Sequence, residues 1–543
     1  MKKHNTVKVV LITMLVFMIL SWIFPAAYFS SEYVEQGRVQ MGLFDLFNYP
    51  LTALSYFGYI ALFIVMVGGF YGILYKIPAY RTFLDKIATK LKGKGMFTLS
   101  VIMILIAVLT SVCGLQLALI VFFPMLVSII LLMGYDKMVA ALTLVGSTMI
   151  GIAGTTFGYT NSTIILSVLS LDINYEILVK VVILIAGLAL LILNTVLYIK
   201  KTNITKKNQM KAEKTVVKAI SEEVSDMSEV ESPKTTKTTK NSKSTTKSTK
   251  STKKTTTKKS SSKSSKKDNK AAVKDEEIIV VKEMVNADEE EKLVPTMVDS
   301  KHKVWPFVVS FVILFVILLL AFIPWANAFN IKAFETATTA VTEFELFGFP
   351  LFGKLLGTVN AFGAWTITDL FLVMAALVLL LTLIYKVKFN DVLDGFVNGA
   401  KKALGPAVLV ILIYSILVLV TYHPYQLVIY KFFIGLTDGF NVFTSTIVAI
   451  LASLFNSDPS YAFQSVLPYM VSVITNTENY SIIGVLFQSI YGLTMLVAPT
   501  SLILMGVLSY LDIPYGKWFK TIWKLVLELL VILLIIFTIL VLV

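Results

Sequence analysis

Apolar runs long enough to cross a bilayer recur along the whole chain, and they restrict it to few folds. Hydrocarbon offers no water to backbone N–H and C=O groups, so helices and closed barrels are the structures that span membranes. Hydrophobic residues make up 56% of the 543 positions, far more than in a soluble domain. Runs of this length predict an all-α polytopic membrane protein. They lie at Val7–Phe29, Leu51–Tyr75, Phe97–Val112, Leu117–Met133, Val139–Ala153, Ile177–Ile199, Val304–Trp325, Leu370–Tyr385, Pro406–Val420, Val442–Phe455, Ile482–Val497 and Thr521–Val543.

Shorter apolar stretches separate some of these runs. Ile164–Leu171, Ala462–Ile474 and Leu502–Leu511 are too short to span a bilayer and read as half-helices or arms of re-entrant hairpins. We therefore expect about ten to twelve membrane elements. The first run is longer than the apolar core of a signal peptide, so we expect it to be retained as a helix.

One broken helix occurs twice. Residues 160–175 read TNSTIILSVLSLDINY, and residues 499–515 read PTSLILMGVLSYLDIPY. Each is an apolar helix interrupted by a Thr/Ser/Asn/Pro cluster and followed by a turn with Asp, Ile and Tyr. A membrane chain that duplicates a broken helix is typical of secondary transporters, because the break exposes backbone groups at mid-membrane.

Further matches extend the repeat. Phe123–Ile130 resembles Leu467–Ile474, and Phe63–Met66 resembles Phe371–Met374. The end of the first run, WIFPA at 22–26, resembles AFIPW at 321–325. Their common order predicts two internally repeated halves with broken helices, residues 1–200 and 304–543.

Residues 201–303 differ from both halves. Residues 234–267 hold thirteen lysines among Ser and Thr and no acidic residue, and an acidic stretch follows. Such a composition cannot bury a core, so we expect a disordered linker. Its charge places it, with the N-terminus, in the cytoplasm of a cell-membrane protein. The linker is suited to contact anionic lipid. Because no aromatic residue lies among the lysines, specific nucleic-acid binding is not expected.

The basic segments leave the orientation of the repeat open. Lys76–Lys94 and the segment from Lys386 to Lys402 both read as cytoplasmic, and both halves begin on that side. Inverted repeats need an odd number of crossings in each half. Either the repeats are parallel, or one helix lies outside the repeat.

Polar residues interrupt the helices at equivalent positions of the two halves. In lipid, a backbone N–H or C=O group without a hydrogen-bond partner costs roughly several kcal/mol. Such breaks therefore face other protein groups or a water-filled cavity. A helix that restarts after a break offers its N-terminal N–H groups to an anion, while carbonyls and hydroxyls suit Na⁺. The predicted substrate- and ion-binding residues are Gly154, Thr155, Thr156, Thr160, Asn161, Ser162, Asn456, Ser457, Asp458, Ser460, Gln488, Thr494, Pro499, Thr500 and Ser501.

Several chemistries have no support in the sequence. One cysteine and three histidines offer no metal cluster, and there is no phosphate-binding Gly-Lys-Ser/Thr loop or His-Glu-x-x-His motif. We expect neither enzyme activity nor a bound cofactor, apart from a coupling Na⁺ or H⁺. The two arginines, Arg38 and Arg81, lie outside the predicted site, so no bidentate clamp holds a carboxylate there.

Short motifs resemble the YfcC family, relatives of the anaerobic four-carbon dicarboxylate carriers in the ion-transporter superfamily. Pro499-Thr500-Ser501 and PYGKW at 514–518 are similar to the family's late motifs, and GYD at 134–136 is similar to its turn after the fourth span. The break from Gly154 to Asn161 resembles its Gly-Thr…Asn-Pro segment, with Ser162 in place of proline. The hairpin tip, Ser457 to Tyr461, departs from the family's Pro-Ser-Gly-Ser-Gly-Gln. The resemblance implies a carrier for small organic anions, peptides or amino acids.

Two functions from different classes follow. The first is a secondary active transporter or exchanger for small organic anions or amino acids, which works by alternating access, as symporter or antiporter, and is a candidate homodimer. The second is a membrane-anchored scaffold whose basic linker tethers anionic lipid or nucleic acid. Neither the cargo nor the coupling ion follows from the sequence.

Overall fold

The computed structural model describes residues 5–227, 303–357 and 359–542. Residues 5–199 and 303–542 belong to one compact unit, which is helical throughout apart from two small hairpins. The described residues include seven helices long and apolar enough to cross a membrane and four shorter apolar segments. This number and type of elements confirm an all-α polytopic membrane protein. The predicted linker begins inside α9, which runs from Ile177 to Met227, and residues 228–302 lie outside the described residues.

The first half contains α1 (Asn5–Ile23), a β1–β2 hairpin (Ala27–Phe29 and Tyr33–Glu35) and α2 (Asp45–Leu74). Next come α3 (Pro78–Lys92), α4 (Gly95–Cys113), η1 (Ala118–Phe122) and α5 (Phe123–Leu132). A single interrupted helix follows, built from α6 (Lys137–Ala141), η2 (Leu142–Gly146), α7 (Ser147–Ala153) and, after the break, α8 (Tyr159–Val168). Helix α9 completes the half.

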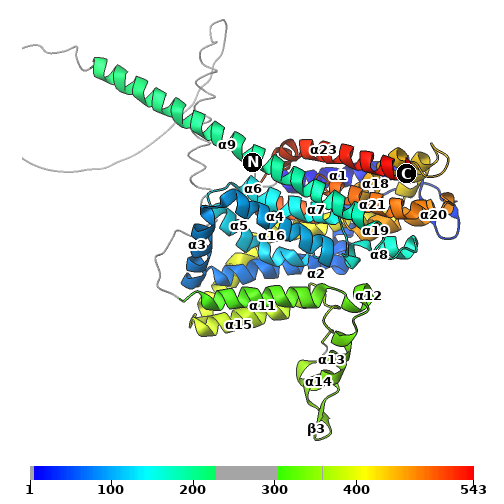
Figure 1. The fold of residues 1–543 in the computed structure, drawn as a ribbon, viewed down its shortest axis with the longest axis horizontal. Coiled ribbons are helices and arrows are strands. Elements are labelled where there is room, and N and C mark those ends of the chain that lie inside the picture. The colour runs from blue at the N-terminus through cyan, green and yellow to red at the C-terminus, as the bar shows by residue number, and fades with distance from the viewer. Residues whose placement is uncertain (1–4, 228–302, 358, 543) are drawn as a thin grey trace, which may run out of the picture. The chain divides into compact units, whose positions relative to one another are not determined.

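The second half begins with α11 (Trp305–Phe322), α12 (Trp325–Phe329), α13 (Ala333–Thr342), strands β3 (Glu345–Leu346) and β4 (Phe349–Pro350), and α14 (Leu351–Leu356). Then come α15 (Leu370–Ile384), α16 (Phe389–Tyr422), α17 (Gln426–Ile434), α18 (Val442–Phe455), α19 (Pro459–Gln464) and α20 (Leu467–Val473). The last elements are α21 (Asn479–Met495), α22 (Leu502–Tyr510) and α23 (Tyr515–Leu542). Figure 1 shows the long helices of both halves packed side by side.

Two helix pairs form re-entrant hairpins. In the first, hairpin 1, α4 runs to a tip at Gly114, and η1 and α5 run back toward the end of the unit where α4 begins. The two ends of this hairpin lie close together, because a Cβ atom on Gly95 at the start of α4 would lie 2.4 Å from the Tyr135 hydroxyl just after α5. In the second, α18 leads to a tip at Asn456–Asp458, and α19 packs back against α18. The predicted arm Ala462–Ile474 forms the return of the second hairpin, and the stretches Ile164–Leu171 and Leu502–Leu511 form the half-helices α8 and α22. The first hairpin is built from Phe97–Val112 and Leu117–Met133, which the sequence predicts as spans.

Equivalent helices of the two halves run antiparallel, which shows that the repeat is inverted. In the pair α2 and α16, Gly68 meets Gly399, and Gly72, one turn later, meets Gly395, one turn earlier. Around Gly72, the facing residues Gly395 and Gly399 also lack a Cβ atom, so the two backbones come into direct contact there. Helices α7 and α21 also cross near their C-terminal ends, through backbone atoms of Met149 and Ala153 next to Gly492.

The helix that lies outside the repeat is α11. Helix α1 packs against α16, and α15 packs against α2, so α1 corresponds to α15 rather than to α11. The matches of 22–26 with 321–325 and of Phe63–Met66 with Phe371–Met374 therefore do not mark equivalent elements. The matches of 160–175 with 499–515 and of Phe123–Ile130 with Leu467–Ile474 do, since they join α8 with α22 and α5 with α20.

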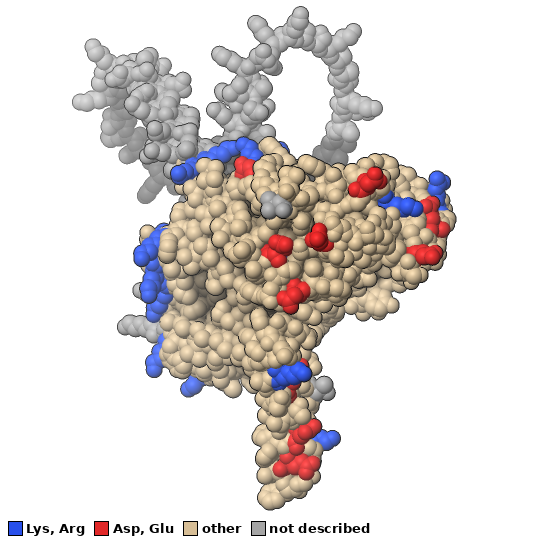
Figure 2. All heavy atoms as spheres, turned by 45° about the vertical axis from the view of Figure 1, so that its right-hand side comes forward, with Lys and Arg blue, Asp and Glu red and all other residues tan. Residues whose placement is uncertain are grey.

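Basic residues define one end of the unit, which we call the basic end. Helix α3 lies there with Arg81, Lys86, Lys90 and Lys92, and Figure 2 shows Lys and Arg gathered along this edge. The start of α16 reaches the same end, where Phe307 stacks between Tyr80 and Tyr385. The segment from Lys386 to Lys402 is thus not the equivalent of α3. That place in the second half belongs to α17, which follows α16 and precedes the hairpin.

Candidate functional site

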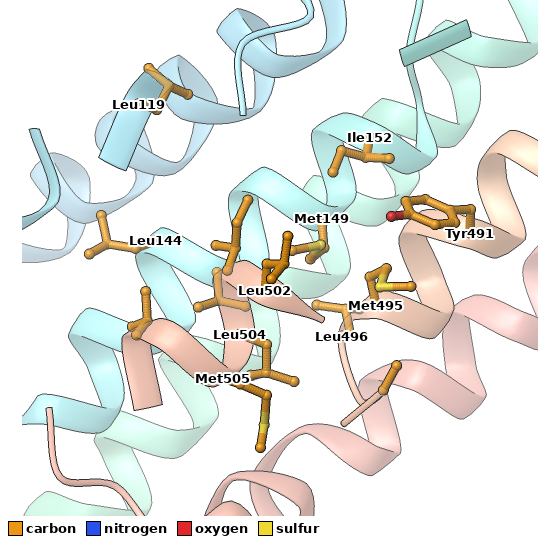
Figure 3. Packing of buried hydrophobic residues seen from close by; sticks show 14 of the residues in the cluster. Leu119, Leu144, Met149, Ile152, Tyr491, Met495, Leu496, Leu502, Leu504 and Met505 are labelled. Atoms are coloured by element: carbon orange, nitrogen blue, oxygen red, sulfur yellow. The ribbon is translucent and has the colours of Figure 1, made fainter. Parts of the chain in front are cut away.

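Both hairpins and both interrupted helices converge on a small cavity in the middle of the unit. Figure 3 shows Met149 and Ile152 of α7, Tyr491 and Met495 of α21 and Leu502 of α22 around the same space. About 20 Å³ is open to the centre of a water molecule, room for one or two waters. The lining residues are Gln116, Leu117, Met149, Ile152, Ser457, Asp458, Pro459, Tyr491, Met495, Ser501, Leu502 and Ile503.

Three of the predicted site residues line this cavity: Ser457, Asp458 and Ser501. Ser457 and Ser501 are 6% and 1% exposed, and neither hydroxyl has a hydrogen-bond partner in the described structure. Ser501 precedes α22 as its N-terminal cap residue but makes no side-chain capping bond. Other buried hydroxyls in the described structure are unpaired too, but these two border the same cavity and are available there to a ligand or water.

Asp458 brings the negative charge. Its Oδ1 accepts a hydrogen bond of 2.8 Å from the backbone N–H of Ser460 and so caps α19. The hydroxyls of Tyr59, Tyr414 and Tyr491 lie within electrostatic reach of its carboxylate. No Lys or Arg is among the residues that line the cavity in the described part of the chain. The site therefore favours a positively charged group beside Asp458.

Other predicted residues of the second half support the backbone around the cavity. Asn456 Nδ2 donates to the Ala452 carbonyl at 3.0 Å, and Thr500 Oγ1 donates to the Leu454 carbonyl at 3.1 Å. The Thr494 carbonyl accepts from the N–H groups of residues 497 and 498, and Pro499 lies in the turn between α21 and α22. These contacts hold the second break against its own hairpin.

Gln488 links the two halves. Its Nε2 donates to the Ile152 carbonyl at 3.1 Å, and the neighbouring Ser489 Oγ donates to the Ala153 carbonyl at 2.9 Å. Both carbonyls belong to the last turn of α7. The Ile152 carbonyl also accepts from Thr155, whereas Ser489 is the donor that the described structure gives to the Ala153 carbonyl. Side chains of the second half thus donate hydrogen bonds to backbone carbonyls at the break in the first half.

The first break is bound by Ser111 on hairpin α4. Ser111 Oγ donates to the Gly154 carbonyl at 2.6 Å, and the Ser111 carbonyl accepts from the backbone N–H groups of Thr156 and Gly158 at 3.0 and 2.9 Å. Thr155 Oγ1 donates back to the Ile152 carbonyl at 2.8 Å. The polar groups of this break are therefore largely paired within the protein.

Residues after the first break reach the cavity through one intermediate. Asn161 Oδ1 accepts from Gln116 Nε2 at 3.0 Å, and Gln116 itself lines the cavity. Thr160 Oγ1 donates to the Gly114 carbonyl, and Ser162 Oγ donates back to the Gly158 carbonyl, both at 3.2 Å. The first break thus orients the tip of hairpin 1 instead of lining the cavity itself.

Replacing Ser111 with alanine is expected to destabilise the protein by about 1–3 kcal/mol, because the buried Gly154 carbonyl loses its donor. The measurement is the melting temperature of purified protein in detergent. Ser167→Ala is the matched control, since this exposed serine bonds only the Ile164 carbonyl of its own helix. Equal melting temperatures for the two variants would contradict the role given to Ser111.

Sequence reasoning missed the contributions of Gln116, Leu117 and Tyr491. Gln116 and Leu117 lie in a tip that looked poor in polar groups, and Tyr491 lies in an ordinary helical run. The available signal was symmetry: Gln116 lies in the tip of the first hairpin as Asp458 lies in the tip of the second. Tyr491 donates its hydroxyl to the Ser457 carbonyl at 3.1 Å and so fixes the second tip.

A second, larger cavity lies next to the first and shares Leu117 with it. It measures about 460 Å³ by the same criterion, within the range of small-molecule sites. Its other walls are Tyr59 of α2, Phe322 at the end of α11, and the segment Thr366–Thr368 before α15. Phe322 and Thr366–Thr368 lie at the end of the unit opposite the basic end, so this cavity extends from that end to Leu117.

Comparison with known proteins identifies the family. The family model described as DcuC, C4-dicarboxylate anaerobic carrier, matches residues 4–246 and 267–542. The chain belongs to this carrier family. The match confirms the resemblance noted in the sequence and shows that the protein is a multi-pass membrane transporter.

Other comparisons add little. No curated protein sequence matches the chain. Among solved structures, the chain is similar to one whose title reads "Crystal structure of the Alcanivorax borkumensis YdaH transporter reveals an unusual topology". The identity is 11%, the TM-score is 0.35, and the alignment covers 98% of this chain and 97% of the other.

Proposed function

We propose that this carrier is a secondary active transporter or exchanger that moves amino acids across the cell membrane by alternating access. The observation that carries the proposal is the cavity at which both hairpin tips and both interrupted helices meet, with two unpaired hydroxyls and one carboxylate. Inverted repeats with interrupted helices around a central site are the architecture of many secondary transporters.

The charges around the cavity favour an amino acid over a dicarboxylate. A substrate ammonium fits beside Asp458, where the carboxylate and the faces of nearby tyrosines both attract a cation. A substrate carboxylate fits the N-terminus of α22, where Ser501 offers its free hydroxyl and the helix dipole is positive. In a dicarboxylate, the second carboxylate would stand against Asp458 with no arginine to offset the repulsion.

The small volume of the inner cavity is consistent with a closed conformation. An amino acid needs several times this space, so binding requires that the hairpin tips separate. The larger cavity supports an access route from the end opposite the basic end, with Leu117 between the two spaces. In alternating access, the inner cavity then opens first toward one end of the unit and next toward the other.

The orientation follows from the basic end. Short membrane-adjacent segments rich in Lys and Arg remain in the cytoplasm. The proposal therefore puts the basic end and the N-terminus in the cytoplasm, and the access cavity on the outer side. Coupling to Na⁺ or H⁺ would involve Asp458, the carboxylate in the cavity.

Counterflow in proteoliposomes tests the proposal. Vesicles preloaded with one unlabelled compound are assayed for uptake of labelled amino acids and C4-dicarboxylates, with Na⁺ and pH gradients imposed separately. We expect counterflow with an amino acid and little with a dicarboxylate. Counterflow with dicarboxylates alone would overturn the assignment of cargo, and none with any compound would overturn the exchange mechanism.

A further inference from the structure

The segment between α11 and α15 forms a projecting arm, defined here as residues 325–357. It has no equivalent in the first half, because α11 lies outside the repeat and α15, which follows the arm, corresponds to α1. Figure 1 shows the arm leaving the end of α11 through α12 and extending across the direction of the long helices, with β3 at its far tip. Because α11 is long and apolar enough to span the membrane, a segment crosswise to it at its end runs along the membrane surface.

The tip of the arm is apolar and exposed. Phe344, Leu346, Phe347 and Phe349 are 47%, 44%, 100% and 53% exposed, and Leu355 is 73% exposed. Charged residues border this tip, among them Glu343 and Glu345. Apolar residues gathered at an exposed tip, with a polar border, mark a surface that contacts another apolar phase.

Phe347 is also in an unfavourable backbone conformation. Leu346 pairs with Phe349, so Phe347 and Gly348 form a two-residue turn, with φ of 55° and 77°. Such turns favour Asn or Gly at both positions, and a bulky residue with positive φ is uncommon. A phenylalanine that is both fully exposed and conformationally disfavoured is better explained by what it contacts than by the stability of the turn.

We propose that the tip of the arm inserts into the interfacial layer of the bilayer, at the end of the unit opposite the basic end. The bilayer is favoured over a second copy of the chain for two reasons. The tip is a narrow two-residue turn that exposes one side chain on all sides, which cannot supply the area of a stable protein interface. The arm also leaves from α11, a helix whose Val308, Val312 and Val316 are exposed along a length that can span the membrane. Aromatic side chains at this level anchor membrane proteins to the interface.

Site-directed fluorescence in proteoliposomes tests the proposal. The one native cysteine is removed with Cys113→Ala, and Phe347→Cys is labelled with an environment-sensitive dye. We expect blue-shifted emission that brominated lipids quench strongly and that aqueous iodide hardly changes. Two labelled controls bracket the result: Val312→Cys on the exposed face of α11, and Thr336→Cys at an exposed polar position of α13.

Quenching by iodide as strong as at Thr336 would place the tip in water and overturn the proposal. Protection from both quenchers, together with cross-linking between two copies through Phe347→Cys, would overturn it in favour of a dimer contact. Circular dichroism and a monodisperse elution profile establish that each labelled variant is folded. The readout does not involve cargo, so it stands or falls independently of the amino-acid proposal.

Discussion

Replacing Asp458 with asparagine is expected to weaken amino-acid binding by at least about 30-fold and to remove most transport. The variant deletes the negative charge of the cavity but keeps a side-chain oxygen for the bond from the Ser460 N–H. Because asparagine is as good a helix N-cap as aspartate, α19 should remain intact. Binding is measured by the shift of melting temperature with added amino acid, and transport is measured by counterflow.

The matched control is Asp172→Asn. Asp172 also accepts hydrogen bonds from neighbouring groups, both from Asn174 at 2.8 Å, but it lies in an exposed turn between α8 and α9. We expect this variant to transport at the wild-type rate. If Asp458→Asn instead improved binding of a dicarboxylate, the carboxylate would be repelling the cargo, and the cargo would be a dianion.

Replacing Gly72 with alanine is expected to destabilise the fold by about 3 kcal/mol. The new Cβ atom would lie 2.1 Å from the Gly395 carbonyl oxygen and 2.7 Å from the Gly399 Cα atom. Both are backbone atoms of α16, so no side chain can turn away, and the two helices must move apart. The measurements are the yield of monodisperse protein and its melting temperature.

Gly506→Ala provides the comparison for this prediction. Gly506 lies inside α22, and a Cβ atom there would meet nothing within 4 Å. Alanine favours helix over glycine by up to about 1 kcal/mol, so this variant should be as stable as the wild type or slightly more so. A Gly72→Ala protein that melts at the wild-type temperature would show that the α2–α16 crossing is not a close backbone contact.

Much of the fold could be predicted because helix breakers are conspicuous within apolar runs. The equivalence of α8 and α22 was visible from the polar cluster before each helix and the Asp turn after it. The inversion was not visible, because it depends on which helices meet in space. Phe63–Met66 and Phe371–Met374 resemble each other as short apolar runs do, yet α2 is related to α16 through its glycines.

The site was predictable only in part. Ser457, Asp458 and Ser501 stood out because polar residues next to a proline in an apolar region have few explanations besides function. Thr155 and Thr156 stood out as hydroxyls beside Gly154 in an apolar run, but their groups pair with α7 and Ser111. The sequence alone cannot distinguish a polar group that is available to bind a ligand from one that is already hydrogen-bonded to a serine far away in the chain.

The bonds from Gln488 and Ser489 to the end of α7 also bear on how the protein is made. Until α21 is in the membrane, the Ala153 carbonyl lacks its Ser489 donor in a medium that provides no substitute, whereas the Ile152 carbonyl keeps the bonds from Thr155. The first half therefore leaves the ribosome with an unfinished interior, and its maturation must wait for synthesis of residues 479–543. Truncation before α21 should yield an inserted but degradable product, and separate co-expression of the missing residues should rescue it.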